Sequence, residues 1–348
     1  DLLPSERQKV QSEVIVCTKE PLEKQAGGHF SRSRLTVNLT GMHAKSQKLI
    51  LVLTFWVLAF HATTRATEDA AAIGSKTAYD EAEIAPLLDK PLYEFSEQQV
   101  DRYLKYLQAT QPDLRKRIVH LARKNIGQPY ELYLLGEMPF EHYDPQPIYC
   151  LEKSDCVVYS EHTYAMALAN DWPGFMKLLQ RIRYRDGQIG VATRNHYTEP
   201  DWNPSNRWLV RDVTEESAGE HVLFYEQRID RQGFLKKRYE LETDIPAETH
   251  RDCFVPLEHL EQVKPHLKPG DFVNVVRGRP ADEPGSGQEF RGSAWVGHVG
   301  LIAHGPDGTV NLIHSAKPKV REQPLDEFVA QSLENIDQPE RAGKPRLL

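Results

Sequence analysis

The sequence predicts an α+β fold in which helices come first and antiparallel strands follow. Two observations support this prediction. Between residues 96 and 168, apolar side chains recur at the three- and four-residue spacing of helices, whereas residues 272–314 contain β-rich runs separated by turns. The chain has 348 residues, of which 40% are hydrophobic and 27% charged, so wholesale disorder is excluded.

A short apolar run near the start of the sequence is typical of a signal peptide. Two lysines follow Met42, the first methionine, and the apolar run Leu49–Phe60 comes directly after them. The run is too short to span a bilayer comfortably; a membrane anchor or a buried core helix is the alternative to export. We therefore expect residues 1–41 to be a non-native upstream extension and residues 42–66 to be a signal peptide. The mature protein is then periplasmic or extracellular, with no stable membrane insertion.

Helical patterns dominate the first half of the expected mature chain. Residues 67–95 are rich in Ala and Glu without a clear period, so we expect a linker there. Two amphipathic helices follow Ser96, and another begins at Cys156, because Asp155 is a typical N-cap before an apolar run. One more helix is expected over Trp172–Arg181. The apolar positions that define the first three helices are Val100, Tyr103, Leu104, Leu107, Leu114, Ile118, Leu121, Val157, Tyr159, Tyr164 and Leu168.

The second half alternates β-rich runs with turns. The expected strands are Val222–Tyr225, Phe272–Val276, Trp295–Ala303 and Val310–His314. The last two form a hairpin, because Gly305–Gly308 is a turn between them. We expect the Pro- and Gly-rich segment Arg277–Gly292 to be a loop that borders a site. The domain accordingly covers residues 96–336, and residues 337–348 form a polar tail.

The chain has four cysteines, and three of them lie in the expected domain. Cys17 falls in the expected upstream extension. Cys150 and Cys253 are able to pair in an oxidising compartment, which leaves Cys156 as the free thiol. Three unpaired thiols are the alternative, and the sequence leaves both open.

Cys156 and two histidines form a candidate catalytic set. At the start of a helix, unpaired backbone N–H groups and the helix dipole favour the thiolate of Cys156, and the same N–H groups can hold an oxyanion. His298 and His314 lie on the two arms of the expected hairpin, where one side chain can fix the tautomer of the other. A lone Cys or His is more often part of a packed core. The combination nevertheless predicts a nucleophilic thiol with an imidazole base.

A series of short motifs runs from the first helical region to the last strand. In chain order they are Gly127-Gln-Pro129-Tyr130, Leu135-Gly136-Glu137, Asp155-Cys156 with Glu161, Ile182–Gly187, Arg194–Tyr197, Asp201-Trp202, Asn206, Asp212–Thr214, Gly270-Asp271, Gly297–Gly300 and Leu312–His314. This pattern resembles the NlpC/p60-like group of papain-like cysteine peptidases, and within it the N-acetylmuramyl-L-alanine amidases, formerly a domain of unknown function. The resemblance implies a papain-like NlpC-type core: a nucleophile helix packed on an antiparallel sheet, with N-terminal helices and an insertion at about residues 182–268.

The resemblance also implies a role for each site residue. The implied catalytic residues are Cys156 as the nucleophile, His298 as the general base and acid, and His314 as the orienting group. Tyr130 lines the site, Asp155 contacts the substrate or caps the helix, and Glu161 supports the site from behind or is a solvated helix charge. The expected substrate-binding cluster, which suits a sugar and a carboxylate, is Arg194, His196, Tyr197, Asp201, Trp202 and Asn206. A loop held by its own hydrogen bonds is the alternative for that cluster.

The motifs and the resemblance together imply an exported cysteine amidase. It hydrolyses the N-acetylmuramyl-L-alanine bond of peptidoglycan or muropeptide substrates through a thioester, and it needs no cofactor and no metal. The alternatives are a γ-D-glutamyl stem-peptide endopeptidase, a metal-dependent hydrolase and an inactive wall-binding module. No His-Glu-x-x-His or Cys-x-x-Cys spacing supports a zinc site. The net charge of -7 argues against a nucleic-acid partner.

Overall fold

The computed structural model describes residues 16–21, 79–282, 285–334 and 346–347. The described residues from Glu81 onward, together with residues 16–21, belong to one compact unit. The expected signal peptide lies outside the described residues. None of the described helices combines the length and the apolar character needed to cross a membrane.

The predicted helices are present, and side-chain caps define where they begin. The helices of the described part are α2 (Glu81–Leu88), α3 (Glu97–Thr110), α4 (Leu114–Lys124), α5 (Cys156–Leu168), α6 (Trp172–Arg183), α7 (Asn203–Ser205), α8 (Thr214–Ala218), α9 (Arg231–Tyr239), α10 (Leu260–Val263) and α11 (Leu325–Glu334). Before α3, Ser96 accepts a hydrogen bond from the N–H of Gln99, whose side chain accepts one from the N–H of Ser96. Before α6, Asp171 accepts from the N–H of Gly174 at 2.7 Å.

Helix α5 is the central helix of the domain. Every residue from Val158 to Ala167 is buried, which explains why its sequence is apolar without a clear polar face. Helices α4 and α6 both pack against it. The Tyr164 hydroxyl donates a hydrogen bond to the carbonyl of Gly270 at 2.8 Å, which ties the helix to the turn that precedes β5.

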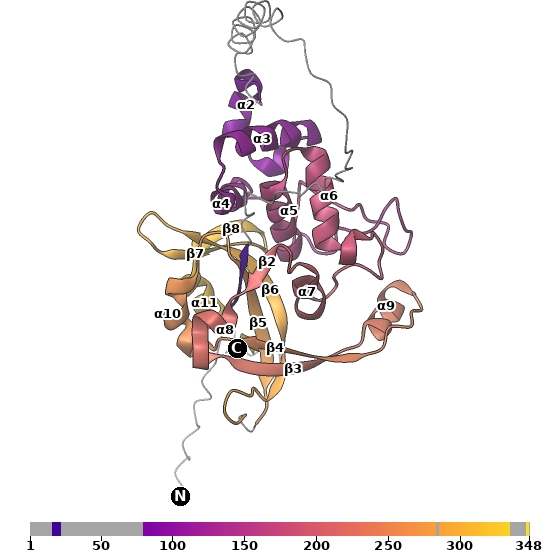
Figure 1. Cartoon of the computed structure of the whole chain (residues 1–348), viewed down its shortest axis with the longest axis vertical. Coiled ribbons are helices and arrows are strands. Elements are labelled where there is room, and N and C mark those ends of the chain that lie inside the picture. Colours follow the sequence, from indigo (N-terminus) through magenta and orange to yellow (C-terminus); the bar gives the residue numbers. More distant parts are fainter. Residues whose placement is uncertain (1–15, 22–78, 283–284, 335–345, 348) are drawn as a thin grey trace, which may run out of the picture. The chain divides into compact units, whose positions relative to one another are not determined.

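The strands form one large antiparallel sheet and one separate ribbon (Figure 1). They are β1 (Val16–Pro21), β2 (Val210–Asp212), β3 (Leu223–Ile229), β4 (Glu248–Phe254), β5 (Phe272–Pro280), β6 (Gly292–His304), β7 (Val310–Ala316), β8 (Lys319–Pro324) and β9 (Arg346–Leu347). The large sheet has the order β2-β1-β5-β6-β7-β8, with β9 also paired to β5, and β3 pairs with β4 alone. The hairpin expected from the sequence is the β6–β7 pair, and the described fold is α+β as predicted.

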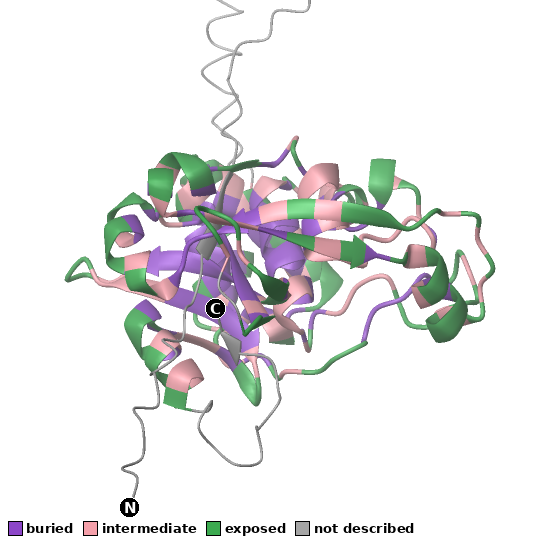
Figure 2. Cartoon of the chain, turned by 90° about the horizontal axis from the view of Figure 1, so that it is seen from below, coloured by how far each residue is buried: buried purple, intermediate pink, exposed green. Residues whose placement is uncertain are grey.

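Helices cover the sheet and complete its core. Helices α4 and α5 pack against β6, and α5 also contacts β7. A further cluster joins α8, α10 and α11 to strands β5, β6 and β7; it includes Ala218, Leu260, Val263, Val273, Val275, Ile302, Leu312 and Phe328. Figure 2 shows the buried residues concentrated on the central strands. The strands that carry His298 and His314 therefore lie at the centre of the domain.

Two segments are more ordered than the sequence predicts. Residues 81–95 are not a linker, because α2 and the short helical turn Leu92–Glu94 bury Ile84, Leu87 and Leu92. These few apolar positions are diluted by Ala and Glu, so no period is visible in the sequence. Strand β5 continues to Pro280, so the expected loop at Arg277–Gly292 is shorter than its composition indicates.

Two strands lie in segments that the sequence analysis set apart from the domain. Strand β1 falls in the expected upstream extension, yet it pairs with β2 and with β5. Strand β9 falls in the expected polar tail and pairs with β5 at Arg277 and Gly278. Neither segment shows strand periodicity over enough residues to be recognised from sequence, and in each case an edge of β5 supplies the hydrogen bonds.

The β3–β4 ribbon forms an arm that carries α9 at its tip (Figure 1). The arm falls within the expected insertion. Helix α9 is fastened to the segment around His196: Arg231 Nε donates to Asp201 at 2.7 Å, and the ring centroids of Phe234 and His196 are 4.9 Å apart. The arm therefore carries a helix back toward the residues that the sequence analysis assigned to a substrate pocket.

A β-bulge at Gly297 directs the residue that follows it. In the β5–β6 ladder, Val276 pairs with Val296 and Val275 pairs with His298, so Gly297 has no partner residue. A bulge adds local twist and redirects the next side chain, and bulges are common next to functional sites. The bulge thus sets the direction of His298.

Gly300 allows β6 and β7 to approach closely beside the two histidines. A Cβ at this position would lie 2.7 Å from Leu312 Cδ1 and 3.2 Å from His314 Cβ, and both neighbours are buried. At Gly297, in contrast, a Cβ would meet only the flexible Arg277 side chain, at 2.5 Å. The Gly-His-Val-Gly motif is therefore explained by a bulge at its first position and by packing at its last.

We predict that Gly300→Ala lowers the free energy of unfolding by about 1–3 kcal/mol, because the added methyl overpacks the β6–β7 contact. Gly297→Ala is the matched control and should cost less, since the Arg277 side chain can move away. Urea unfolding of both variants tests this difference. Equal losses in the two variants would show that the close approach at Gly300 does not limit the packing.

Candidate active site

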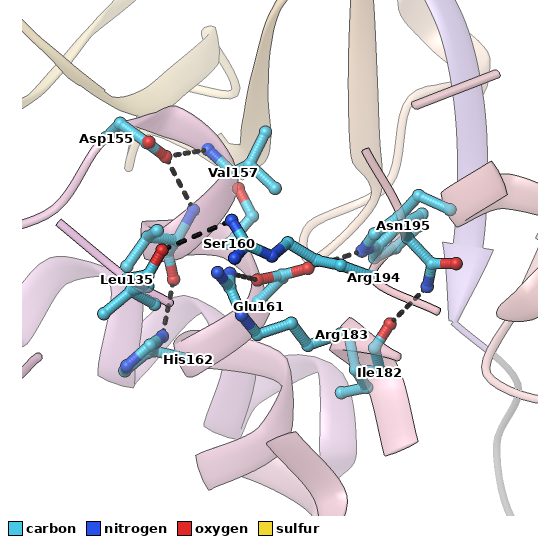
Figure 3. A network of polar contacts seen from close by, with 12 residues as sticks. Leu135, Asp155, Val157, Ser160, Glu161, His162, Ile182, Arg183, Arg194 and Asn195 are labelled. Atoms are coloured by element: carbon cyan, nitrogen blue, oxygen red, sulfur yellow. Dashed lines mark hydrogen bonds and ion pairs between the residues drawn. The ribbon is translucent and has the colours of Figure 1, made fainter. Parts of the chain in front are cut away.

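The first turn of α5 carries the candidate nucleophile. Cys156 is the first residue of the helix and Asp155 is its cap. One carboxylate oxygen of Asp155 accepts hydrogen bonds from the N–H groups of Val157 and Val158, at 3.0 and 2.9 Å (Figure 3). The helix start and the capping role of Asp155 agree with the prediction. A contact between Asp155 and a substrate stays a prediction.

The Cys156 thiol is half-buried and neutral at rest. Burial, followed by the nearby Asp155 carboxylate, raises the pKa of Cys156 to about 12, whereas the N–H of Val299 that faces the sulfur lowers it. The sequence analysis expected the helix N-terminus to favour the thiolate. The structure corrects this expectation, because Asp155 occupies N–H groups of the first turn and adds negative charge beside the sulfur.

The two candidate histidines contact each other directly. Nε2 of His298 and Nδ1 of His314 share a hydrogen bond of 2.7 Å, and Phe328 of α11 packs against both rings. Burial is the main cause that lowers the pKa of both groups, to about 3 for His314. Since a histidine is protonated only below its pKa, both imidazoles are neutral at pH 7.

Helix α5 contacts the two histidine-bearing strands, β6 and β7, whose pairing ends before the histidine of β6. Pairing between these strands stops at Leu301 and Ile313, before His298 is reached. Beyond this point Val299, the residue after His298, turns its N–H toward the Cys156 sulfur. Among the described residues, no hydrogen bond joins the thiol to either imidazole. Because Nε2 of His298 is bonded to His314, Nδ1 is the ring nitrogen left for proton exchange with a thiol or a substrate.

A buried serine pair joins the start of α5 to the strand that carries His314. Ser154 Oγ and Ser315 Oγ are 3.0 Å apart, Ser315 Oγ donates to the carbonyl of Ser154 at 2.9 Å, and Ser154 Oγ donates to Gln128 Oε1 at 2.7 Å. The sequence analysis did not select Ser154 or Ser315 as residues of the site. Their positions were informative, because Ser315 directly follows His314 and Ser154 comes two residues before Cys156.

Tyr130 lies beside the nucleophile. Burial, then the neighbouring Cys156 and Asp155, raises the pKa of its hydroxyl to about 12. Its backbone N–H donates to the carbonyl of Pro318 at 3.0 Å, so the residue is fixed to the loop after β7. The structure thus places Tyr130 next to the thiol, and its contact with substrate stays a prediction.

Glu161 lies behind the nucleophile and forms a buried ion pair (Figure 3). Its carboxylate is 3.3 Å from Arg183 Nη1 and accepts a hydrogen bond from Trp202 Nε1 at 3.1 Å. Glu161 is not a solvated charge, and Arg183, which the sequence analysis did not select, is buried as well. Helical spacing could have revealed Arg183, because it follows the buried Leu179 by one turn of α6.

Arg194 is held by acidic side chains of the protein. Its Nε donates to Glu137 Oε1 at 2.6 Å, Nη2 contacts the other oxygen of Glu137, and Nη2 donates to Asp144 at 2.9 Å. Burial lowers the pKa of Arg194, but the bonds to Glu137 outweigh it and the pKa is raised overall. With its charge already balanced, Arg194 anchors the loop that contains Glu137, and a role in binding substrate stays a prediction.

Three further members of the expected substrate cluster have partners within the protein. The His196 ring donates from Nε2 to the carbonyl of Val191 at 2.6 Å, and burial lowers its pKa to about 3. Asp201 accepts hydrogen bonds from the N–H of Tyr197 at 3.1 Å and from Arg231 Nε at 2.7 Å. These contacts agree with the alternative of a loop held by its own hydrogen bonds.

The last two members of the cluster, Trp202 and Asn206, lie in the interior. The Trp202 ring stacks on Phe272 with centroids 4.6 Å apart, and Asn206 Nδ2 donates to the carbonyl of Ile182 at 2.9 Å. Their side chains therefore pack the core behind Glu161. The sequence could not separate this role from sugar stacking, because both use aromatic and amide groups.

The three cysteines of the domain are all free thiols, so Cys150 and Cys253 do not form the disulfide that the sequence left open. Cys253 is buried in the core beside α10 and α11. In the part of the chain that is described, no group of three His, Cys, Asp or Glu side chains is arranged to hold a metal ion.

Comparison with known proteins identifies a family. Residues 120–335 match the family AmiA-like, described as N-acetylmuramoyl-L-alanine amidase-like, and this range includes Cys156, His298 and His314. A search among curated proteins gives no match. The match covers more than half of the chain and spans the helix and the hairpin that form the candidate site.

The chain is similar to solved structures at low sequence identity, and one of them, with a TM-score above 0.5, shares the fold. A Legionella pneumophila protein of the family DUF1460 is 19% identical, covers 70% of this chain and 90% of its own, and has a TM-score of 0.57. An N-acetylmuramoyl-L-alanine amidase from Bacteroides uniformis is 20% identical, covers 62% of this chain and 93% of its own, and has a TM-score of 0.45. With the thiol, the paired histidines and the family match in place, the chain belongs to the AmiA-like, N-acetylmuramoyl-L-alanine amidase-like family.

Proposed function

We propose that this protein is an exported cysteine amidase that hydrolyses the bond between N-acetylmuramic acid and L-alanine in peptidoglycan fragments. The observation that supports this proposal most strongly is the hydrogen bond between His298 and His314 at the end of the β6–β7 hairpin. At the same end of the hairpin, the N–H of Val299 faces the Cys156 sulfur. Family membership supports the class of hydrolase and the peptidoglycan substrate. The arrangement of a thiol at a helix start and two imidazoles on adjacent strands supports an NlpC-type papain-like core.

The acylation step uses the thiol and His298. The thiol proton moves to Nδ1 of His298 while the sulfur forms a bond to the carbonyl carbon of the lactyl group. The oxyanion that results lies at the start of α5, where the backbone N–H of Cys156 stabilises it. The C–N bond then breaks, and His298 returns the proton to the departing L-alanine nitrogen. His314 accepts the hydrogen bond from Nε2–H of His298 and so fixes the tautomer that leaves Nδ1 free.

The deacylation step regenerates the enzyme with water. His298 takes a proton from water, the water oxygen bonds to the thioester carbon, and the C–S bond breaks as the proton passes to sulfur. One water is consumed, and the products are N-acetylmuramic acid and a peptide with a free L-alanine amine. Acylation and deacylation each begin with a neutral imidazole. Burial lowers the pKa of His298 and of His314, so both are neutral at pH 7.

Export rests on the basic and apolar segment within residues 42–66. A periplasmic or extracellular location brings the enzyme to its peptidoglycan substrate. Radiosequencing or mass spectrometry of the N-terminus of the secreted protein tests this part of the proposal, and an N-terminus before residue 42 would contradict it.

Hydrolysis of N-acetylmuramyl-L-alanyl-D-isoglutamine tests the proposed activity. We predict that the parent protein releases free N-acetylmuramic acid, that Cys156→Ala releases none, and that Cys150→Ala keeps the parent rate. Cys150 is the matched control because it is a half-buried thiol near the same helix. Mass spectrometry of the products gives the readout.

Other outcomes of that assay, and of the same assay with a muropeptide that carries a tetrapeptide stem, contradict the proposal. Cleavage of a tetrapeptide stem after the D-glutamyl residue, with the amide to the sugar intact, would identify a γ-D-glutamyl endopeptidase. Equal activity in the parent and in Cys156→Ala would remove the thiol from the mechanism. Binding of peptidoglycan without any cleavage would identify a wall-binding module.

The pH dependence of thiol alkylation tests the resting state. Because the pKa of Cys156 is about 12, we predict that its alkylation by iodoacetamide becomes about tenfold faster per pH unit up to about pH 9. His298→Ala should leave this slope unchanged, since the neutral imidazole does not stabilise a thiolate at rest. A rate that levels off near neutral pH in the parent alone would instead reveal a thiolate–imidazolium pair.

Substitutions of His314 test its role as the hydrogen-bond acceptor of His298. We predict that His314→Leu lowers kcat by about 100-fold or more, because His298 loses the partner that fixes its tautomer. His314→Asn retains an acceptor oxygen and should recover part of the loss. Thermal unfolding of both variants separates this effect from instability, and equal kcat values in His314→Leu and the parent would contradict the orienting role.

A further inference from the structure

Exposed apolar side chains are concentrated in one segment beside the candidate active site. Of the seven large hydrophobic residues that are exposed in the described chain, five lie in this segment: Leu132, Tyr133, Met138, Phe140 and Tyr143. Single exposed apolar residues need no explanation, but a concentration of them marks a binding surface. The segment precedes α5 and is shaped by pairing of Met138 with Pro147.

Tyr133 is the most exposed member and has a strained backbone. Its residue surface is 72% exposed and its φ is 60°, in the left-handed region that favours glycine. Arg238 of α9 lies over its ring, with the guanidinium carbon 4.6 Å from the centroid. A large exposed ring and a strained backbone are both unfavourable for folding, and such combinations persist mainly at functional sites.

The start of this segment is fastened to the residues before the nucleophile. The N–H of Glu131 donates to the carbonyl of Ser154 at 3.1 Å, and Lys153 Nζ is 2.6 Å from the Glu131 carboxylate. Tyr133 follows by two residues, and its hydroxyl interacts electrostatically with that of Tyr130, which lies beside Cys156. Tyr133 therefore lies two residues after a backbone contact with Ser154, which itself comes two residues before Cys156.

We propose that Tyr133, supported by Arg238, is the specificity-determining residue for the sugar part of the substrate. The apolar C–H face of the N-acetylmuramyl ring packs against the exposed face of the Tyr133 ring, whose negative π surface attracts those C–H groups. Arg238 holds the ring in place and α9 brings Arg238 there. This inference rests on the proposed function, since it assigns a subsite for the acyl side of the same amide.

Binding to an inactive enzyme tests the sugar subsite separately from catalysis. The full chain carrying Cys156→Ala is titrated calorimetrically with N-acetylmuramyl-L-alanyl-D-isoglutamine and with L-alanyl-D-isoglutamine, which lacks the sugar. Adding Tyr133→Ala should weaken the muropeptide roughly tenfold, equivalent to about 1.4 kcal/mol, and leave the dipeptide unchanged. Tyr133→Phe retains the ring and should retain the affinity. Leu88→Ala, which removes a 48% exposed apolar side chain outside this segment, is the control and should have little effect.

Stability distinguishes this role from a structural one. Tyr133→Gly relieves the positive φ, so we expect its thermal midpoint to equal or exceed that of the parent while muropeptide affinity falls as in Tyr133→Ala. A lower midpoint for Tyr133→Gly, equal weakening of both ligands, or equal weakening by Leu88→Ala would overturn the inference.

The two proposals can fail independently. If the parent cleaves the muropeptide but Tyr133→Ala binds it normally, the subsite is wrong and the amidase stands. If binding depends on Tyr133 but the parent cleaves nothing, the subsite stands and the amidase is wrong.

Discussion

The buried contact between Ser154 and Ser315 is the constraint on which the geometry of the site depends. It holds the start of α5 against β7, one residue away from His314, and Gln128 completes it from the loop after α4. Neutral hydroxyl groups make this junction without adding a charge beside the thiol. Once the junction is formed, the bulge at Gly297 directs His298 and the missing side chain at Gly300 admits His314.

Two groups of ion pairs join segments that surround α5. Glu161 and Arg183 are both buried, and the buried Glu137 pairs with the half-buried Arg194, which also contacts Asp144. Breaking one such pair leaves an unpaired buried charge, which is costly, so these pairs fix the segments that surround α5. The reacting groups themselves are neutral at rest. In the proposed mechanism, the neutral thiol reacts once a substrate excludes water and aligns it with His298.

The sequence predicts the elements that carry chemistry more reliably than the surroundings of the site. Asp155 before an apolar run locates the start of α5, and the turn at Gly305–Gly308 between two β-rich runs locates the hairpin. These features are local. The role of Arg194 was not visible, because it depends on Glu137 and Asp144, which are distant in the chain. The expectation of a thiolate at Cys156 was wrong for a related reason. It considered the helix dipole but not the carboxylate of Asp155 or the burial of the thiol, both of which raise the pKa of Cys156. Tyr133 has no sequence signature at all, since its φ and its exposure appear only in the folded chain.

The central claim is that the Cys156 sulfur is the nucleophile of the covalent step. The most direct measurement relates alkylation of Cys156 to loss of activity. Hydrolysis of N-acetylmuramyl-L-alanyl-D-isoglutamine is followed during stepwise alkylation with iodoacetamide, and peptide mapping gives the fraction of Cys156 modified at each step. The account predicts that activity falls in proportion to that fraction and reaches zero when Cys156 is fully alkylated, with the muropeptide protecting it. Activity that persists in protein fully alkylated at Cys156 would contradict the account.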